Sequence, residues 1–186
     1  MRKLLTATGL VVALGLLPAH AHAQAFLTPM VGATFGHDAP ATKLSTGVSL
    51  AFLGKAAGLE LELGYTPDFF NQQTELALIA DSNVTSGMAN ILIGPAIGRV
   101  RAYGLVGAGV LRSRIHAGDL FDAVDTNDTA VDAGGGVIVM ISDHVGVRGD
   151  LRYFRSLKDP SNDGNLDVTL GNFDFWRATA GLSLKF

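Results

Sequence analysis

Apolar and polar side chains alternate along most of this chain with a period of two residues, and this pattern constrains its fold more than any other feature. The alternation is typical of β-strands whose two faces meet different surroundings, and helical periodicity is almost absent. Residues that favour turns separate the runs. We therefore predict an all-β protein with eight strands of about ten residues each. The predicted strands are Phe26–Phe35, Leu44–Leu53, Leu59–Tyr65, Val84–Ile93, Arg99–Arg112, Thr129–Ile141, Val145–Arg155 and Phe173–Phe186.

The lengths of the connections between these strands also alternate. The joins after the second, fourth and sixth strands are short: Gly54–Gly58, Gly94–Gly98 and Ser142–His144. The joins after the third, fifth and seventh strands are long: Thr66–Asn83, Ser113–Asp128 and Ser156–Asn172, whereas the first join, Gly36–Lys43, is intermediate. Outer-membrane barrels have short periplasmic turns and longer outer loops. The pattern therefore predicts an eight-stranded, antiparallel, up-and-down transmembrane β-barrel.

The N-terminal segment has the parts of a secretory signal peptide. Arg2 and Lys3 supply the positive start, residues 4–17 are mostly apolar, and small residues alternate over 19–25. The apolar run is too short to serve comfortably as a membrane-spanning anchor. We predict a signal peptide over residues 1–23, cleaved after Ala23 or alternatively after Ala25, and a barrel over residues 24–186.

Alternation alone does not decide which face of the barrel points outward, as the seventh strand illustrates. Arg148, Asp150 and Arg152 share one face, whereas Val147 and Leu151 share the other. In a soluble lipocalin-like barrel, the charged face meets water. In a membrane barrel, the apolar face meets lipid and the charged face points inward.

The charges on the inward face favour the membrane arrangement, because they nearly balance one another. Charges that are removed from water need partners of opposite sign, and a barrel of eight strands is just wide enough to be filled by side chains. We predict a structural charge network inside the barrel. Its members are Glu60, Glu62, Asp132, Asp150, Arg101, Arg148, Arg152, Arg177 and Lys185.

Aromatic residues gather near the ends of the expected strands. Aromatic girdles at both membrane interfaces are expected of a transmembrane barrel, although strands favour aromatic residues in any case. We predict one girdle near the long connections and a second near the short turns. The first comprises Tyr65, Phe69, Phe70, Tyr153, Phe154, Phe173, Phe175 and Trp176, and the second comprises Phe26 and Phe186.

Three glycine-containing segments and the final strand resemble the OmpA/OmpX-like family of eight-stranded outer-membrane barrels. The segments are Tyr103–Val110, Ala133–Val137 and Val145–Tyr153, and the ending is Leu182–Phe186. The resemblance implies an integral protein of the bacterial outer membrane, surrounded by lipid and lipopolysaccharide. It also implies that Leu182, Leu184 and Phe186 form the assembly signal that the outer-membrane insertion machinery recognises. The family contains structural proteins, adhesins, complement-resistance factors and a few lipid-modifying enzymes, so the resemblance does not fix the activity.

Composition excludes several classes of chemistry. The chain has no cysteine, which excludes disulfides, thiolate metal sites and a catalytic thiol. Its net charge of −3 offers no basic face for nucleic acid. The positions of His37, His116 and His144 give no Ser-His-acid triad. We predict no enzymatic activity and no cofactor.

One acidic connection partly matches a calcium-binding loop. Asp159, Ser161, Asp163 and Asp167 supply oxygen atoms at four ligand positions, but Leu170 stands where the bidentate glutamate belongs. Because turns rich in Asp, Asn, Pro and Gly are ordinarily solvated, we predict a turn here rather than a metal site.

Three functions fit these features. We favour a monomeric, integral outer-membrane barrel with a structural or surface-interaction role, in which the outer loops contact a partner that the sequence does not name. A small porin-like channel requires an open lumen. A soluble periplasmic lipocalin-like binding protein requires the reversed barrel, with Val145, Val147 and Leu151 lining a cavity.

Overall fold

A computed structural model describes residues 23–36, 42–67, 69, 81–116, 124–157 and 174–186. The strands in these residues are β1 (Gln24–Phe35), β2 (Lys43–Leu53), β3 (Ala57–Pro67), β4 (Asp81–Ile93), β5 (Ala96–Ile97), β6 (Val100–His116), β7 (Val124–Met140), β8 (Val145–Leu157) and β9 (Asp174–Lys185). Within the same ranges, no helix has the length and hydrophobicity needed to cross a bilayer.

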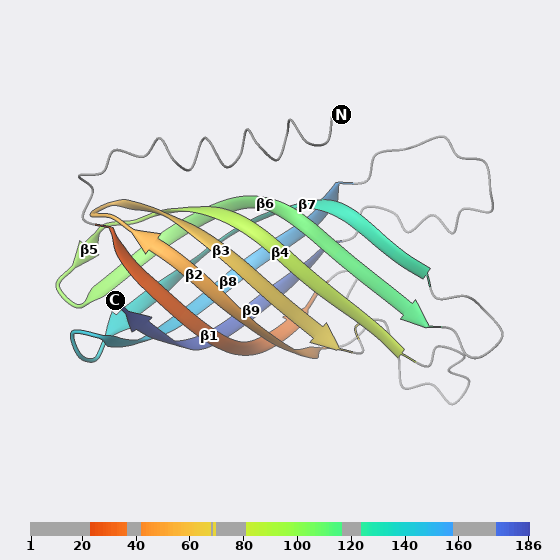
Figure 1. The fold of residues 1–186 in the computed structure, drawn as a ribbon, viewed down its shortest axis with the longest axis horizontal. Coiled ribbons are helices and arrows are strands. Elements are labelled where there is room, and N and C mark those ends of the chain that lie inside the picture. Colours follow the sequence, from red (N-terminus) through yellow and green to blue (C-terminus); the bar gives the residue numbers. More distant parts are fainter. Residues whose placement is uncertain (1–22, 37–41, 68, 70–80, 117–123, 158–173) are drawn as a thin grey trace.

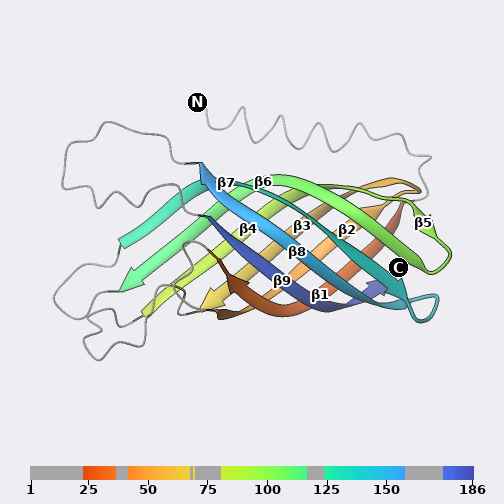
Figure 2. The same cartoon turned by 180° about the vertical axis from the view of Figure 1, so that it is seen from behind.

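The strands form one antiparallel sheet that closes on itself (Figures 1 and 2). Each long strand pairs with the next long strand in the chain, and β1 also pairs with β9. β5 is a two-residue strand in the turn between β4 and β6, which pair directly with each other. The wall of the barrel therefore has eight strands, which confirms the predicted all-β, up-and-down fold.

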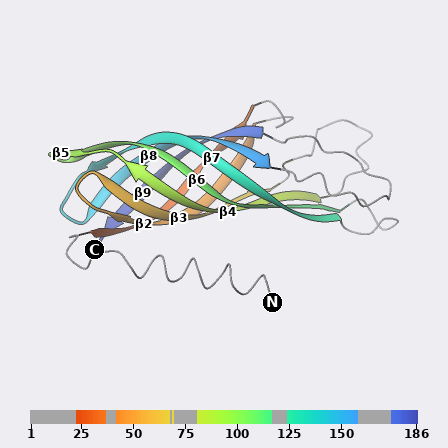
Figure 3. The same cartoon turned by 90° about the horizontal axis from the view of Figure 1, so that it is seen from above.

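The two ends of the barrel differ. The turns over residues 54–56, 94–99 and 141–144 lie at one end, together with the C-terminus, and we call this the short-turn end (Figure 1). The opposite end, where β3, β6 and β8 finish, is the long-connection end. At this end β4, β6 and β7 extend beyond the other strands (Figures 1 and 3).

This extension corrects one predicted boundary. We predicted a long connection over Ser113–Asp128, but β6 continues to His116 and β7 begins at Val124. Arg114 pairs with Asp125 in the ladder between the two strands. The sequence pattern missed these residues because polar side chains there interrupt the apolar alternation, although backbone pairing does not require apolar residues.

The outer surface of the wall is apolar and the inner surface is polar. On β8, Val147 and Leu151 are exposed, whereas Arg148, Asp150 and Arg152 are buried inside the barrel. The alternation continues around the barrel, and many outward side chains are large and apolar, including Val31, Leu50, Leu61, Leu63, Ile91, Val106 and Leu182. A soluble barrel has its charged side chains outside, so this arrangement is the one suited to lipid and not the lipocalin-like one.

The aromatic side chains depart from the predicted girdles. Phe26, Phe69, Phe154 and Phe175 are buried inside the barrel and not on its outer surface. Phe154 follows Arg152 by two residues, so the pleat of β8 places both on the inner face. Tyr153 and Trp176 do lie on the outer face, with their ring centroids 5.3 Å apart. Phe70 and Phe173 lie outside the described residues. The outer girdle is thus smaller than predicted.

Buried apolar side chains fill both ends of the interior. The cluster at the short-turn end comprises Phe26, Ala51, Leu53, Leu92, Tyr103, Leu105 and Ile138. The cluster at the long-connection end comprises Phe69, Val84, Met88, Leu111, Ala130, Phe154 and Phe175. Within the latter, the rings of Phe154 and Phe175 stack with centroids 4.9 Å apart. The charged residues lie between the two clusters.

The seam between β1 and β9 contains a gap in its ladder. Phe26 and Leu27 pair with Lys185 and Leu184, and pairing resumes from Met30 onward. Pro29 stands in the gap, where a proline has no backbone N–H to donate. The buried hydroxyl groups of Thr28 and Ser183 form a hydrogen bond of 2.9 Å across the seam at this point. A side-chain contact thus joins the two strands where the backbone ladder is interrupted.

Candidate functional site

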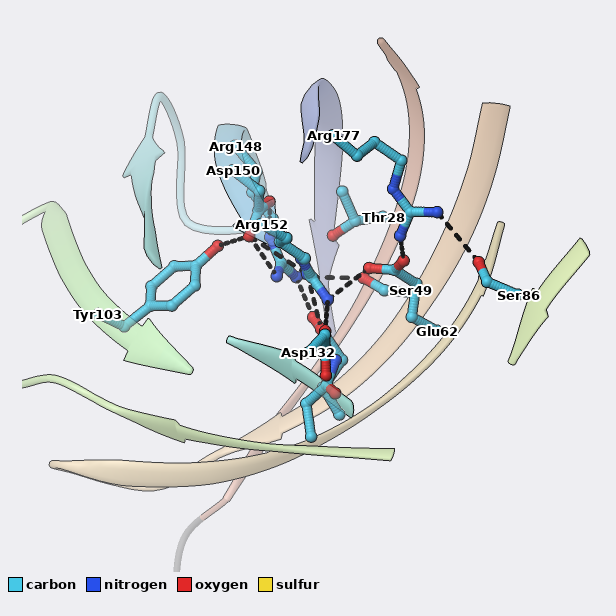
Figure 4. Close-up of polar contacts among 12 residues, drawn as sticks. Thr28, Ser49, Glu62, Ser86, Tyr103, Asp132, Arg148, Asp150, Arg152 and Arg177 are labelled. Carbon is cyan, nitrogen blue, oxygen red and sulfur yellow. Dashed lines mark hydrogen bonds and ion pairs between the residues drawn. The ribbon is translucent and has the colours of Figure 1, made fainter. Parts of the chain in front are cut away.

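Seven buried charged residues form a belt across the middle of the interior, and we call them the ion-pair belt (Figure 4). β3, β7, β8 and β9 contribute them at inward positions of the pleat, so that residues two apart on a strand share the inner face. The members are Glu60, Glu62, Asp132, Arg148, Asp150, Arg152 and Arg177.

Glu60 on β3 has three partners inside the barrel. Its Oε2 lies 2.5 Å from Nη1 of Arg148, and its Oε1 accepts a hydrogen bond of 2.8 Å from Nη2 of Arg152. The amide nitrogen of Asn90 donates to the same Oε1 at 3.1 Å. Since β3 and β8 are not neighbours in the sheet, these ion pairs cross the lumen.

Glu62 connects the belt to the last strand. Its Oε2 lies 2.6 Å from Nη1 of Arg152, and its Oε1 accepts a hydrogen bond from Nη2 of Arg177 on β9. Arg177 also donates to the hydroxyl of Ser86 at 3.0 Å, and its guanidinium lies 4.3 Å from the ring centroid of Phe154. This cation–π contact joins the belt to the apolar cluster at the long-connection end.

Asp150 connects the belt to the opposite cluster. Arg148 donates to both of its oxygens, from Nε at 2.7 Å and from Nη2 at 3.0 Å. The phenol of Tyr103 donates to Oδ1 of Asp150 at 2.7 Å, and the Arg148 guanidinium lies 5.2 Å from the Tyr103 ring centroid. Bidentate, charge-assisted bonds of this kind fix both side chains in one geometry.

Asp132 on β7 is the least supported member. Its closest cation is Nη1 of Arg152 at 3.6 Å, and neither of its oxygens has a hydrogen-bond partner among the described residues. The belt contains four acids and three arginines, so it carries one negative charge in excess. Asp132 is the carboxylate with the weakest compensation for its charge.

Two residues of the expected charge network lie outside this belt. Arg101 and Lys185 are half-buried at the short-turn end, because each stands at the end of its strand. Arg101 donates to the backbone carbonyls of Gly54 and Gly94 at 2.7 and 3.4 Å. The expected network thus divides into the central ion-pair belt and a pair of cationic residues, Arg101 and Lys185, at the short-turn opening of the barrel, which we call its mouth.

Sequence reasoning missed the neutral partners of the belt. Ser49 accepts from Arg148 at 3.1 Å, and Ser86, Asn90 and Tyr103 also bond to belt residues. All four are buried, and all occupy inward positions in the alternation of β2, β4 or β6. The register could have identified them, since a buried ion needs neutral hydrogen-bond partners as well as a counter-ion.

The other candidate residues are placed as follows. Leu182 and Phe186 are exposed on the outer face, and Leu184 on the same face is half-buried. His144 is exposed in the turn after β7, whereas Asp159, Ser161, Asp163 and Asp167 lie outside the described residues. In the described part of the chain, no three acidic or histidine side chains are grouped so as to hold a metal ion.

The comparison with protein families decides what kind of barrel this is. The model of the family described as outer membrane protein beta-barrel domain matches residues 9–186. The chain belongs to this family. It is an integral β-barrel protein of the bacterial outer membrane, as the apolar outer wall and the charged interior also indicate. None of the curated proteins compared with the chain matches it.

Three solved structures of outer-membrane proteins have the same fold as this barrel, although their sequence identity to it is low. Neisserial surface protein A matches with a TM-score of 0.65 and 14% identity, over 88% of this chain and 97% of that one. Ail of Yersinia pestis, in complex with the heparin analogue sucrose octasulfate, matches with a TM-score of 0.57 and 13% identity, over 88% and 99%. The barrel domain of Pseudomonas aeruginosa OprF matches with a TM-score of 0.55 and 17% identity, over 88% and 97%.

Proposed function

We propose that this outer-membrane barrel has a structural and surface-interaction role and does not conduct solutes. The observation that carries the proposal is the set of ion pairs that cross the lumen. Arg148 and Arg152 on β8 bind Glu60 on β3, and Arg177 on β9 binds Glu62 on β3. Strands that are distant in the sheet are thereby connected through the space that a channel must leave open.

The apolar clusters on both sides of the belt support the same proposal. A solute path requires continuous water along the lumen, and buried Phe, Leu and Ile side chains occupy both ends of it. Eight strands leave an interior that side chains are able to fill. A porin-like channel fits this interior poorly.

Conductance in a planar bilayer tests the closed lumen. We expect the wild type to give no stepwise current. A variant with Glu60→Ala, Glu62→Ala, Arg148→Ala and Arg152→Ala removes four of the seven belt residues. It is expected to admit ions when Leu53→Ala and Phe154→Ala also open the apolar clusters at the two ends. Lys43→Ala at the long-connection end is the control, because it leaves the belt intact. Regular current steps from the wild type would refute the closed lumen and favour the small porin-like channel.

The composition of the long connections supports a surface-interaction role. The stretches 66–83, 113–128 and 156–172, which include the adjoining ends of β3, β4, β6, β7 and β8, contain ten acidic and two basic residues. Without bridging cations, stretches of this composition repel polyanions, so we do not propose the sulfated ligand of the Ail structure as the partner. Acidic side chains are able to share divalent cations with anionic phosphates, and we propose lipopolysaccharide as the partner that they approach in this way.

Binding to lipopolysaccharide tests this second part. Protein in phosphatidylcholine nanodiscs is mixed with lipopolysaccharide in the presence of Mg²⁺ or of a chelator. We expect the protein-containing nanodiscs to retain lipopolysaccharide only when Mg²⁺ is present. The amount retained is expected to fall when Asp119, Asp122, Asp163 and Asp167 are changed to Asn. Asp143→Asn, in the turn at the short-turn end, is the control for loss of an acidic residue at the opposite end of the barrel. Retention that neither the chelator nor these changes alter would overturn the proposed partner.

A further inference from the structure

A pocket opens at the short-turn end of the barrel, which faces the periplasm in outer-membrane barrels. Its volume is about 450 Å³, within the range of pockets that hold small ligands. Four cationic residues line it: Lys55, Arg99, Arg101 and Lys185. Lys55 and Arg99 come from the turns over 54–56 and 94–99, and Arg101 and Lys185 come from the ends of β6 and β9, so the fold brings the four together from distant parts of the chain.

No acidic residue lines this pocket. Asp143 is the one acid in the described turns of this end, and it lies outside the lining. Among the described residues, none of the four cations forms an ion pair with Asp, Glu or the terminal carboxylate. This contrasts with the belt, where every arginine contacts at least one carboxylate.

Backbone carbonyls, and not counter-ions, orient two of the guanidinium groups. Arg101 donates to Gly54 and Gly94, and Arg99 donates to the carbonyl of Ile141 at 3.3 Å. Neutral carbonyls position a guanidinium without cancelling its charge. The mouth therefore presents positive groups that are already oriented and are available to an anion.

The inner side of the pocket, which we call its floor, is apolar, whereas the four cationic residues form its rim. Phe26, Leu53, Ile138 and Met140 line its inner side, and the first three belong to the buried apolar cluster at this end. This cluster separates the pocket from the belt. A ligand that matches the pocket therefore has an anionic end at the rim and an apolar part on the floor.

We propose that the periplasmic mouth of the barrel binds an amphiphilic phosphate, with its phosphate group on the cationic rim and a short apolar chain on the floor. Phosphate suits this rim because it carries up to two charges and accepts bidentate hydrogen bonds from arginine. The ligand is either the headgroup region of a membrane phospholipid or a soluble phosphorylated compound. This inference is independent of whether the lumen conducts or the outer connections bind lipopolysaccharide.

Hexyl phosphate is the probe that tests this site, with the protein held in phosphatidylcholine nanodiscs. Binding is followed by the chemical shifts of backbone amides near Lys55 and Lys185. We expect hexyl phosphate to bind about tenfold or more tightly than inorganic phosphate, because only the former covers the floor. Hexyl glucoside, which has the same chain and no charge, is expected not to bind.

Two matched pairs of substitutions separate the rim from general charge effects. Lys55→Gln with Lys185→Gln is expected to weaken hexyl phosphate by about tenfold or more, since both side chains line the pocket. Lys43→Gln with Arg155→Gln removes the same charge at the long-connection end and is expected to leave the affinity unchanged. Met140→Gln is expected to reduce the advantage of hexyl phosphate over inorganic phosphate. Equal weakening by both pairs, or equal binding of hexyl glucoside, overturns the proposal.

A second membrane composition distinguishes the two sources of the ligand. If a lipid headgroup occupies the mouth, nanodiscs that contain phosphatidylglycerol lower the apparent affinity for hexyl phosphate by competition. An unchanged affinity assigns the site to a soluble phosphate. Both results support the pocket, whereas the absence of saturable binding in either membrane refutes it.

Discussion

Two conservative substitutions in the ion-pair belt are expected to change the free energy of unfolding by very different amounts. Glu60→Gln and Asp132→Asn each replace a carboxylate with an amide, and both positions are almost fully buried, with 1% and 3% of their surface exposed. Glu60 has two arginine partners within 2.8 Å, whereas the closest cation to Asp132 is 3.6 Å away. The pair therefore separates the effect of the contacts from the effect of burial.

The contacts determine the magnitude of each change. Glu60→Gln removes two charge-assisted interactions worth about 1.5–3 kcal/mol each, and it leaves buried arginine charge without compensation. We expect it to lower the free energy of unfolding by about 3–5 kcal/mol. Asp132→Asn instead removes the excess negative charge of the belt and breaks no hydrogen bond in the described residues. Its free energy of unfolding is expected to remain within about 1 kcal/mol of the wild type or to increase.

Equilibrium unfolding by urea measures both changes. Trp176 is the one tryptophan of the chain and lies on the outer face, where its fluorescence reports transfer from lipid to water. The reversible transition in thin phosphatidylcholine vesicles gives the free energy for each variant. Equal losses for Glu60→Gln and Asp132→Asn would refute the reasoning, because burial alone, and not the pairing, would then set the cost.

Three further predictions concern the wall and the C-terminus. A side chain at Gly109 would overlap the carbonyl of Gly87, so Gly109→Ala should lower the free energy of unfolding by about 1–3 kcal/mol in the same urea assay. Gly104 lies on the same strand, and a Cβ there would be 3.8 Å from its closest neighbour. Gly104→Ala should therefore change the free energy of unfolding by less than about 1 kcal/mol. Leu61 is 56% exposed on the outer face. Leu61→Arg should lower the free energy of unfolding in lipid by about 2–4 kcal/mol, and it should reduce the yield of refolding in detergent much less. Phe186 is 76% exposed and packs little against the barrel. If it belongs to the assembly signal, Phe186→Ala should reduce outer-membrane insertion in cells and leave refolding in detergent unchanged, and equal losses in both would count against that role.

Much of this fold could be predicted from the alternation of side chains. A period of two residues in each strand sets which residues face inward, and the inward position of Arg148, Asp150 and Arg152 follows directly from their spacing on β8. The alternation of connection lengths identified the antiparallel order. The same pattern could not define where β6 and β7 end, because their polar outer parts pair through the backbone and leave no apolar signal.

The partners within the belt could not be predicted from the sequence. Which arginine meets which carboxylate depends on contacts across the lumen between strands that are distant in the sheet, and local alternation carries no information about those distances. Position along the barrel axis also matters. It places Arg101 and Lys185 at the mouth, although they share the inner face with the belt. Aromatic residues were misplaced for a related reason, since Phe154 and Phe175 follow the pleat to the inside.

The seam between β1 and β9 makes the last step of barrel closure depend on the register of these two strands. Phe26 pairs with Lys185, so the two edges stay unpaired until the whole barrel segment has been synthesised, and closing so large a loop is slow. A slip of one residue at closure turns the faces of β9 around and moves Arg177 from Glu62 into the lipid. The hydroxyl contact between Thr28 and Ser183 is also lost in that register. The same buried charges that fill the lumen therefore make closure in a slipped register energetically unfavourable.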